Sequence, residues 1–269
     1  MLDEAGFDRA LSEDADEALT LLADLTGATD AALRERARRL AGRLVLDLAR
    51  PAAPRRRGIG RLRRAPADRE EGDLDIDASL EPLLLARAGG PPPALDELSV
   101  RAWGRHDLAV CLLVDRSGSM GGDRLATAAL AAAACAWRAG ADWSLCAFSD
   151  RVLVLKSQDE GRGASAVVDD VLALRGFGPT DLSLALRTAS AQLGRSRAGR
   201  RLTVLLSDCR PTAGEDPQVG ARLLDDLVIV APEDDCEDAA ELARAVGARW
   251  VGVGGPASIP TAFSRLLDR

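Results

Sequence analysis

The sequence has few of the side chains from which many metal and enzyme sites are built. It holds one histidine, His106, and no tyrosine among its 269 residues. Its five cysteines form no Cys-x-x-Cys pair, and four of them lie within or next to apolar stretches. We therefore interpret the cysteines as small buried thiols in a reducing compartment.

Long apolar runs and a secretory leader are also missing. No stretch approaches about 18 uninterrupted apolar residues, the length at which a membrane helix is predicted. The first residues, MLDEAGFDRALSEDADEAL, are acidic where a secretory signal needs positive charge followed by an apolar run. The formal net charge of −7 disfavours a general nucleic-acid binder, because neutralising phosphates requires a basic face. We expect a cytoplasmic protein without a membrane or nucleic-acid partner.

Residues 1–50 predict a helical hairpin. Ser12 is a good N-cap, and the acids and apolar residues that follow it predict a helix that ends at Gly27. A second amphipathic helix should begin near Thr29 or Asp30 and run to Pro51.

Residues 51–104 change in character and predict a charged linker containing Pro and Gly. A basic run, Arg55 to Arg64, precedes an acidic run that includes Asp73, Asp75 and Asp77. We interpret the basic run as a solvated linker, with contact to nucleic acid or an acidic partner as the alternative. The acidic run is interpreted as an exposed edge or a flexible segment, and residues 98–103 as a possible edge strand.

From residue 105 onward, short apolar runs alternate with amphipathic helical stretches. The runs LAVCLLVD, WSLCAFS, RLTVLLSD and LVIVA are nearly continuous in apolar residues, which is typical of strands buried on both faces. Helices between such strands predict a mostly parallel sheet with right-handed crossovers. We therefore predict a doubly wound, Rossmann-like α/β domain over residues 105–269, preceded by the small helical segment and the charged linker.

Two aspartates mark the carboxyl ends of predicted strands in this domain. Asp115 ends LAVCLLVD, and Asp208 ends RLTVLLSD. Ligand sites in doubly wound sheets lie beyond the carboxyl ends of the strands, at the point where the strand order reverses. If these two strands are neighbours at that point, their carboxylates come together.

Hydroxyl groups are predicted around the same point. Ser117 and Ser119 follow Asp115 at alternate positions ahead of a predicted helix, and Thr180 lies in a loop just before another helix. Mg²⁺ takes about six oxygen ligands and usually keeps several waters. The single histidine lies at the other end of the first strand, roughly 30 Å from Asp115 at ~3.3 Å per residue. Zinc and copper are therefore disfavoured.

The sequence Asp115-Arg-Ser-Gly-Ser-Met resembles the Asp-x-Ser-x-Ser signature of the metal-ion-dependent adhesion site of von Willebrand factor A (VWA) and integrin inserted domains. The resemblance covers roughly residues 105–269. It implies that Ser117, Ser119 and Thr180 bind Mg²⁺ through their hydroxyls, with Mn²⁺ or Ca²⁺ as alternatives. It also implies that Asp115 and Asp208 bind the ion directly or through water. One coordination position then remains for an Asp or Glu carboxylate of a partner protein.

Two loops depart from this family pattern, and simpler roles exist for the same residues. Relatives usually have glycine after the second aspartate, where this chain has Cys209, and a double glycine where it has Gly178-Pro179. These departures leave the shape of both loops open. The alternative role for Asp115, Thr180 and Asp208 is to cap helices and turns, because Asp, Ser and Thr favour such positions.

The cytoplasmic relatives that the chain resembles include the D subunit of magnesium chelatase, its cobalt-chelatase counterpart and bacterial proteins that work with MoxR-type AAA+ ATPases. The resemblance implies a non-catalytic adaptor that binds a protein carboxylate through Mg²⁺ and works with a MoxR-type AAA+ ATPase in protein remodelling or complex maturation. The alternative is a subunit of a metal-chelatase complex that inserts magnesium or cobalt. Only about 100 residues precede the domain, too few for the inactive AAA+ module of chelatase D subunits, which favours the adaptor.

Motifs for independent catalysis are absent from the sequence. It contains no Gly-x-Ser-x-Gly nucleophile elbow and no Walker phosphate loop. The loop after Asp115 also differs from the metal loop of phosphotransferases, which needs a second aspartate where this chain has Ser117. With one distant histidine, general-base catalysis would fall to carboxylates that the metal already occupies. We therefore predict that the chain is not an enzyme.

Overall fold

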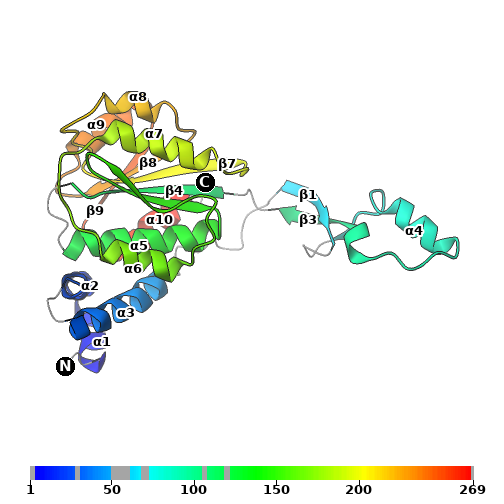
Figure 1. Ribbon diagram of the computed structural model, residues 1–269, viewed down its shortest axis with the longest axis horizontal. Helices are drawn as coiled ribbons and strands as arrows, with labels where there is room; N and C mark the ends of the chain where they lie inside the picture. Colours follow the sequence, from blue (N-terminus) through cyan, green and yellow to red (C-terminus); the bar gives the residue numbers. More distant parts are fainter. Residues whose placement is uncertain are drawn as a thin grey trace. The chain divides into compact units, whose positions relative to one another are not determined.

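The chain forms two compact units (Figure 1). Unit 1 comprises residues 1–54 and 108–269, and unit 2 comprises residues 55–107, which separate the two parts of unit 1 in the sequence. The computed structural model describes residues 4–27, 31–49, 61–67, 73–104, 108–117 and 122–267.

A six-stranded sheet forms the centre of unit 1. Its strands are β4 (Leu108–Asp115), β5 (Trp143–Phe148), β6 (Val152–Lys156), β7 (Arg200–Leu206), β8 (Leu227–Pro232) and β9 (Arg249–Val253). They lie in the order β6-β5-β4-β7-β8-β9 and pair in parallel, except that β6 runs antiparallel to β5 at one edge. The chain continues from β4 to β5 on one side and returns to β7 on the other. This arrangement confirms the predicted doubly wound, mostly parallel sheet.

The two faces of the sheet are buried in separate apolar layers, as the continuous apolar runs predicted. All six residues of β5 are buried, and neighbouring residues of β4 point to opposite layers, Leu112 to one and Leu113 to the other. The helices on the face of Leu112 are α5 (Gly122–Ala139), α6 (Ala164–Leu172) and α10 (Ile259–Leu267). Those on the face of Leu113 are α7 (Leu182–Leu193), α8 (Pro217–Ala221) and α9 (Glu237–Val246). The short α8 was not predicted.

The N-terminal helices form a further layer over α5 and α6. They are α1 (Glu4–Glu13), α2 (Ala15–Leu25) and α3 (Ala31–Leu48). Leu22 of α2 and Val45 of α3 belong to the same buried cluster as α5, so these helices share a core with the sheet. The two predicted helices correspond to α2 and α3. However, Asp14 rather than Ser12 caps α2, by accepting a hydrogen bond from the Glu17 amide at 3.0 Å.

Two glycines allow α2 to approach the rest of unit 1 closely. A Cβ atom at Gly122, the first residue of α5, would overlap the carbonyl oxygen of Thr20 in α2. A Cβ atom at Gly255 would lie 2.5 Å from the carboxylate of Asp16, which also accepts a hydrogen bond from the Ala257 amide at 2.7 Å. Helix α2 therefore contacts both the start of α5 and the loop after β9. None of the helices in the described part of the chain is long and apolar enough to cross a membrane.

Unit 2 contains a small antiparallel sheet. Its elements are β1 (Arg61–Pro66), β2 (Asp73–Leu74), α4 (Leu80–Arg87), the 3₁₀ helix η2 (Leu95–Glu97) and β3 (Ser99–Gly104). The strand order is β1-β3-β2, so the strand predicted at residues 98–103 is the central strand of this sheet and not an edge. Part of the predicted basic linker run lies in β1, where Arg64 pairs in register with Arg101 of β3.

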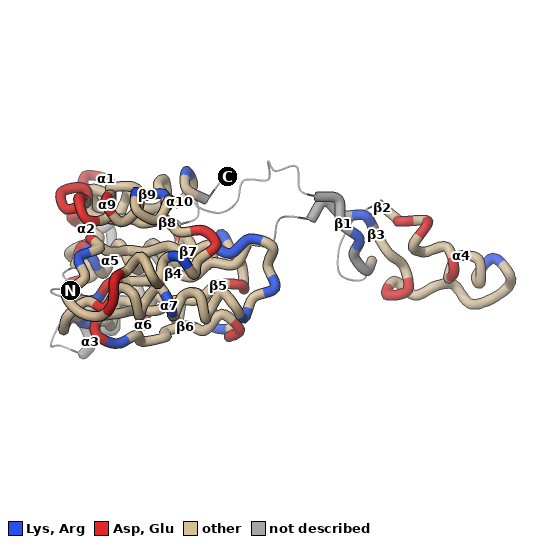
Figure 2. The backbone as a smooth tube through the Cα atoms, turned by 90° about the horizontal axis from the view of Figure 1, so that it is seen from above, with Lys and Arg blue, Asp and Glu red and all other residues tan. Residues whose placement is uncertain are grey.

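A buried carboxylate lies at the centre of unit 2. Asp75 is only 2% exposed and accepts hydrogen bonds from Arg64 at 2.8 Å and Arg101 at 3.3 Å. The guanidinium groups of Arg101 and Arg64 lower the pKa of Asp75 from 3.8 to about 2. The interpretation of the acidic run as exposed or flexible is therefore wrong at Asp75. Figure 2 shows the positive charge on β1 and β3 and acidic residues between β2 and α4.

Candidate functional site

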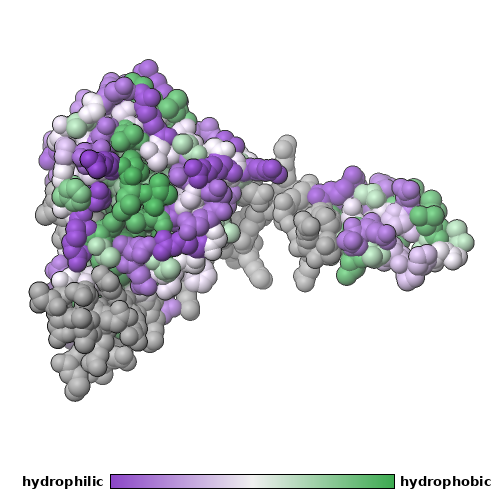
Figure 3. All heavy atoms as spheres, in the orientation of Figure 1, coloured by the Kyte–Doolittle hydropathy of each residue, from purple (hydrophilic) through white to green (hydrophobic). Residues whose placement is uncertain are grey.

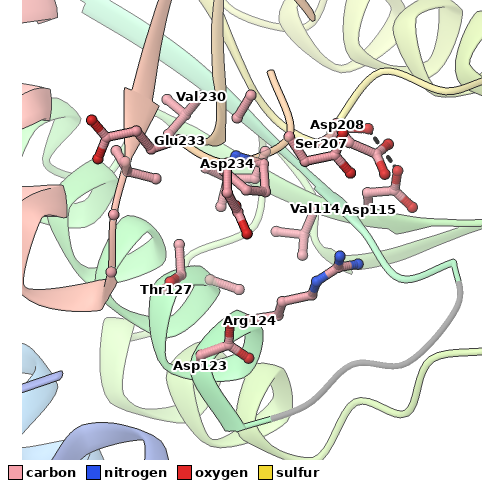
Figure 4. A pocket seen from close by; sticks show the side chains of 18 residues that line it. Val114, Asp115, Asp123, Arg124, Thr127, Ser207, Asp208, Val230, Glu233 and Asp234 are labelled. Atoms are coloured by element: carbon pink, nitrogen blue, oxygen red, sulfur yellow. Dashed lines mark hydrogen bonds between the residues drawn. The ribbon is translucent and has the colours of Figure 1, made fainter. Parts of the chain in front are cut away.

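Asp115 and Asp208 lie at adjacent strand ends of unit 1. Asp115 is the last residue of β4, and Asp208 follows β7, the parallel neighbour in which Leu206 is in register with Val114. Both aspartates line one cavity of about 660 Å³ at the carboxyl ends of β4, β7, β8 and β9 (Figure 4). The reversal of strand order therefore brings the two predicted carboxylates together.

Hydroxyl groups hold both oxygens of the Asp115 carboxylate. Oδ1 accepts hydrogen bonds from the Ser117 amide at 2.9 Å and the Ser117 hydroxyl at 2.6 Å. Oδ2 accepts a hydrogen bond from the Ser207 hydroxyl at 2.6 Å, and Ser207 Oγ in turn accepts one from the Cys209 amide at 2.9 Å. A hydroxyl that donates its proton to a carboxylate keeps oxygen lone pairs with which it can bind a cation.

The loop that carries Thr180 crosses the carboxyl end of β4. On the side of β4 and β5, the Phe177 amide donates to the Arg116 carbonyl at 3.0 Å, and the Asp181 amide donates to the Ser149 carbonyl at 2.9 Å. On the side of β7, the Thr180 amide donates to the Thr212 hydroxyl at 2.8 Å. Because these anchors lie on both neighbours of β4, Thr180 is held above the end of the strand that carries Asp115.

A cation–aromatic contact and a helix cap fix the two ends of this loop. The Arg116 guanidinium lies 4.5 Å from the centre of the Phe177 ring. Asp181 caps α7, since its carboxylate accepts a hydrogen bond from the Leu184 amide at 2.9 Å. Gly178 has a φ angle of +86°, a conformation that glycine adopts without strain. The loop therefore keeps a defined shape with Gly178-Pro179 in place of the double glycine.

The structure places four of the five predicted site residues at this edge of the sheet. Asp115, Ser117 and Asp208 lie at the ends of β4 and β7, and Thr180 lies on the crossing loop. Ser119 lies outside the described residues, and so does His106. The sequence reasoning did not single out Ser207, although it is the residue directly before Asp208. It also missed Thr212, whose bond to the Thr180 amide no local sequence pattern predicts.

The residues and the fold agree with one known family. A family model described as "VWA domain containing CoxE-like protein" matches residues 48–249, which is more than half of the chain. The chain belongs to this family. Its six-stranded, mostly parallel sheet with helices on both faces is accordingly a Rossmann-like VWA fold.

Solved structures with a similar fold are related only distantly in sequence. The D319A mutant of the PilB minor pilin from Streptococcus sanguinis is 13% identical, covers 64% of this chain and 64% of its own, and has a TM-score of 0.50. A von Willebrand factor type A protein from Catenulispora acidiphila is 15% identical, with coverages of 62% and 42% and a TM-score of 0.47.

A third similar structure was solved with a metal. The manganese-loaded TRAP protein from Plasmodium vivax is 14% identical, with coverages of 59% of this chain and 74% of its own and a TM-score of 0.44. A comparison with curated proteins finds no match to this chain.

The position after Asp208 shows how this CoxE-like chain accommodates its departure from the VWA pattern. Cys209 has a φ angle of 65°, in the left-handed region that favours glycine. Its side chain is buried in the apolar layer on the α7 face of the sheet. Burial, together with the negative charges of Asp208 and Asp115, raises the pKa of the Cys209 thiol far above its usual value. The thiol is thus protonated and unreactive, and its apolar contacts offset the backbone strain.

The oxygen donors at this edge of the VWA sheet fit a hard divalent ion. Among the described residues, no cluster of three His, Cys, Asp or Glu side chains could hold a metal ion by itself. An ion between Asp115 and Asp208 would therefore take hydroxyl groups and water as its other ligands, a donor set that suits Mg²⁺ or Mn²⁺ and does not suit zinc. The short hydrogen bonds of Ser117 and Ser207 already orient hydroxyl oxygens around Asp115.

The charged side chains on the remaining walls of the cavity are mostly acidic. Asp123 of α5 and the loop Glu233-Asp234-Asp235 after β8 line it together with the site aspartates. Asp235 is neutralised by Arg210 at 2.5 Å, and Arg210 also pairs with Asp238 at 2.7 Å. Arg124 of α5 is the single basic residue among the described residues that line the cavity. The sequence reasoning singled out neither Arg124 nor the loop after β8.

Proposed function

We propose that this VWA protein is a non-catalytic, Mg²⁺-dependent protein-binding module. Asp115, Ser117, Ser119, Thr180 and Asp208 would hold the ion, with Mn²⁺ or Ca²⁺ as alternatives. The observation that carries the proposal is the Asp115 carboxylate, both oxygens of which bind serine hydroxyls beside Asp208 at the rim of a cavity. When bound, the ion would supply an open coordination position for a carboxylate oxygen of a partner protein.

The surroundings of the ion support binding rather than catalysis. The thiol nearest to the proposed site, Cys209, is buried in the apolar layer on the α7 face, and Asp115 is engaged by two hydroxyl groups. Neither group is poised to abstract a proton from a substrate. We therefore propose that the chain binds its partner and performs no reaction of its own.

We further propose that the partner system includes a MoxR-type AAA+ ATPase. This proposal rests on the CoxE-like family and on the likeness to bacterial proteins that work with such ATPases. The adaptor would present a carboxylate-bearing client, or a loop of the ATPase itself, for remodelling or complex maturation in the cytoplasm.

The first experiment measures metal binding alone. Titration of the protein with Mn²⁺, followed by the loss of the free-ion electron paramagnetic resonance signal, should show one site in the wild type and none in Asp115→Ala. Asp234→Ala is the matched control, because it removes a cavity carboxylate that is outside the proposed site. Equal Mn²⁺ binding by wild type and Asp115→Ala would contradict the proposal.

The second experiment tests the partner. The wild type is used to capture proteins from its native lysate in Mg²⁺ and in EDTA, and Asp115→Ala is used in Mg²⁺. We expect a MoxR-type ATPase or its client to be retained only by the metal-loaded wild type, with retention of the ATPase depending on nucleotide. Identical capture in all three conditions would contradict a metal-dependent interaction.

A further inference from the structure

Arg124 is an unpaired cation in the acidic cavity next to the proposed ion site. It lies in the first turn of α5 and is exposed. Figure 4 shows its side chain extending along the cavity, with the guanidinium group on the side of Val114 and Asp115. With the other described residues it forms no hydrogen bond and no ion pair, although several carboxylates line the same cavity.

Arg210 differs from Arg124 in this respect, because it pairs with Asp235 of the cavity wall. Arg210 pairs with two acids, Asp235 and Asp238, at 2.5 and 2.7 Å. Arg124 has Asp123 as its neighbour in the chain and Asp234 across the cavity, yet within the described part of the chain it forms an ion pair with neither. Its five donors are therefore free to bind a carboxylate supplied by another molecule.

The shape and lining of the cavity suit a side chain that carries a carboxylate on an apolar stem. Between the charged groups, the walls are formed by apolar residues from four strand ends, Val114, Leu206, Val230 and Val253. The volume of about 660 Å³ accommodates such a side chain together with part of its backbone. An aspartate or glutamate could thus enter with its stem against the valines and its carboxylate between Arg124 and Asp115.

The charges of the other walls restrict which acidic segment can enter. Asp123, Glu233 and Asp234 have no cationic partner within the described part of the chain, so they repel any additional negative charge in the cavity. Only the position between Arg124 and the ion is favourable for an anion. A segment with one acidic residue and uncharged or basic neighbours fits this field, and a run of several acids does not.

We propose that Arg124 is a second anchor for the partner carboxylate. One carboxylate oxygen would bind the ion, and the other would accept hydrogen bonds from the Arg124 guanidinium. This inference rests on the proposed function, since it places the partner carboxylate on the ion. It adds Arg124 to the residues that bind the carboxylate. It also adds a rule of selection, by which a segment with one isolated carboxylate is bound and a polyacidic segment is rejected.

Acetate is the probe for the carboxylate, and Mn²⁺ is the probe for the ion. The protein is loaded with Mn²⁺, and the broadening of the acetate methyl signal in nuclear magnetic resonance reports how tightly acetate binds next to the ion. The variants are Arg124→Gln, which removes the charge, and Arg124→Lys, which keeps the charge but loses the two-pronged geometry. The control variant is Arg222→Gln at the end of α8, outside the cavity, and acetamide replaces acetate as the uncharged probe.

We expect Arg124→Gln to weaken acetate binding about fivefold, the size expected for one charge-assisted contact in a partly solvated cavity. Arg124→Lys should weaken it less, and Arg222→Gln and the acetamide signal should not change. The affinity for Mn²⁺ should be the same in the Arg124 variants as in the wild type or slightly higher, because a positive charge near the ion is removed.

Unchanged acetate binding in Arg124→Gln would overturn the inference. A parallel loss of Mn²⁺ affinity in that variant would also overturn it, because Arg124 would then act by maintaining the structure of the site. Failure of the wild type to bind Mn²⁺ at all would instead refute the proposed function, so the two failures are distinguishable.

The rule of selection has its own test in the same sample. Acetyl-Ala-Glu-Ala-amide and acetyl-Asp-Glu-Asp-amide compete with acetate for the Mn²⁺-loaded wild type. We expect the peptide with one acid to compete better, by about threefold or more, since three unpaired acids face the flanking positions. Equal competition by both peptides, or better competition by the acidic one, would overturn the rule.

Discussion

The two units of the chain are stabilised by opposite means. Unit 1 buries two continuous apolar layers on the faces of its sheet. In unit 2, Val100 is the single buried apolar residue among those described, and two polar residues are buried beside it: Ser79, and Asp75 with its carboxylate between two arginines. About fifty residues bury too little surface for an apolar core, so hydrogen bonds and an ion network take its place.

The two units also differ in how their apolar side chains are covered. Leucines of unit 2 are more than two fifths exposed at Leu74, Leu80, Leu84, Leu85 and Leu95. None of the residues of α4 is buried, and Figure 3 shows apolar surface over this helix. Unit 1 also exposes large apolar side chains, among them Leu21, Phe177 and Leu223, but helices cover both faces of its sheet and enclose two apolar layers. Unit 1 therefore has the larger reserve of stability, and variants of each unit test this contrast.

The largest effect is expected in the core of unit 1. Leu112→Ala removes a fully buried side chain at the centre of β4 and leaves a cavity, so the free energy of unfolding should fall by about 3 kcal/mol. Urea denaturation followed by tryptophan fluorescence measures this change, since Trp143 lies in the adjacent β5. A loss below about 1 kcal/mol would show that the sheet is less tightly packed than its burial indicates.

A smaller loss is expected where α2 meets α5. Gly122→Ala places a Cβ atom against the carbonyl oxygen of Thr20 and should cost about 1–3 kcal/mol by forcing α2 away from α5. Hydrogen exchange of the amides in residues 15–25 should accelerate, while exchange in β4 and β7 stays slow. Gly161→Ala is the control, because a Cβ atom there meets no neighbouring atom within 4 Å. Unchanged exchange in α2 would contradict a tight contact.

An effect confined to unit 2 is expected from the charge of Asp75. The pKa of Asp75 in the folded protein is about 2, below the usual 3.8, so the charged carboxylate stabilises the fold. This stabilisation is complete above about pH 4. It is lost as the pH falls from about 4 to about 2 and the carboxylate is protonated. The amide signals of β1, β2 and β3 should therefore lose dispersion over this range. Asp75→Asn should produce the same loss at neutral pH, whereas Asp73→Asn, in the exposed strand β2, should not. Retention of the sheet in Asp75→Asn would show that the strand ladder alone holds unit 2.

The smallest effect is expected on α4. Leu84 is 54% exposed, so Leu84→Ala should change the free energy of unfolding by less than about 0.5 kcal/mol. The same substitution at Leu112 is the matched comparison in urea denaturation. A loss above about 1 kcal/mol at Leu84 would mean that this leucine is covered in solution, and the contrast between the units would then be smaller.

The fold of unit 1 could be predicted because its strands are nearly uninterrupted apolar runs, which are typical of parallel strands buried on both faces of a sheet. The positions of Asp115 and Asp208 at strand ends followed from the same runs, and their proximity followed from the strand order. The proximity of the two aspartates could be predicted because a parallel sheet places the carboxyl ends of all its strands at one edge.

The rest of the structure depends on partners that the sequence does not reveal. Arg64 and Asp75 belong to charged runs that are typical of solvated linkers, and only the pairing of both β1 and β2 with β3 brings them into contact. The sequence also did not mark Arg124 as a binding residue, because an arginine in the first turn of an amphipathic helix is common on protein surfaces. Its significance comes from the loop after β8, more than one hundred residues later in the chain.

The insertion of unit 2 has a consequence for the order in which the protein assembles. Helices α2 and α3 are synthesised before unit 2, but the helix that covers their apolar faces, α5, is synthesised after it. Closing a loop costs little equilibrium stability, about 0.6 kcal/mol for each doubling of its length, whereas distant contacts slow folding strongly. The N-terminal leucines thus remain uncovered while more than seventy further residues, 49–121, emerge at roughly 5–20 residues per second. We expect the nascent chain to offer these leucines to chaperones for those seconds, and a short replacement for unit 2 to shorten the exposure.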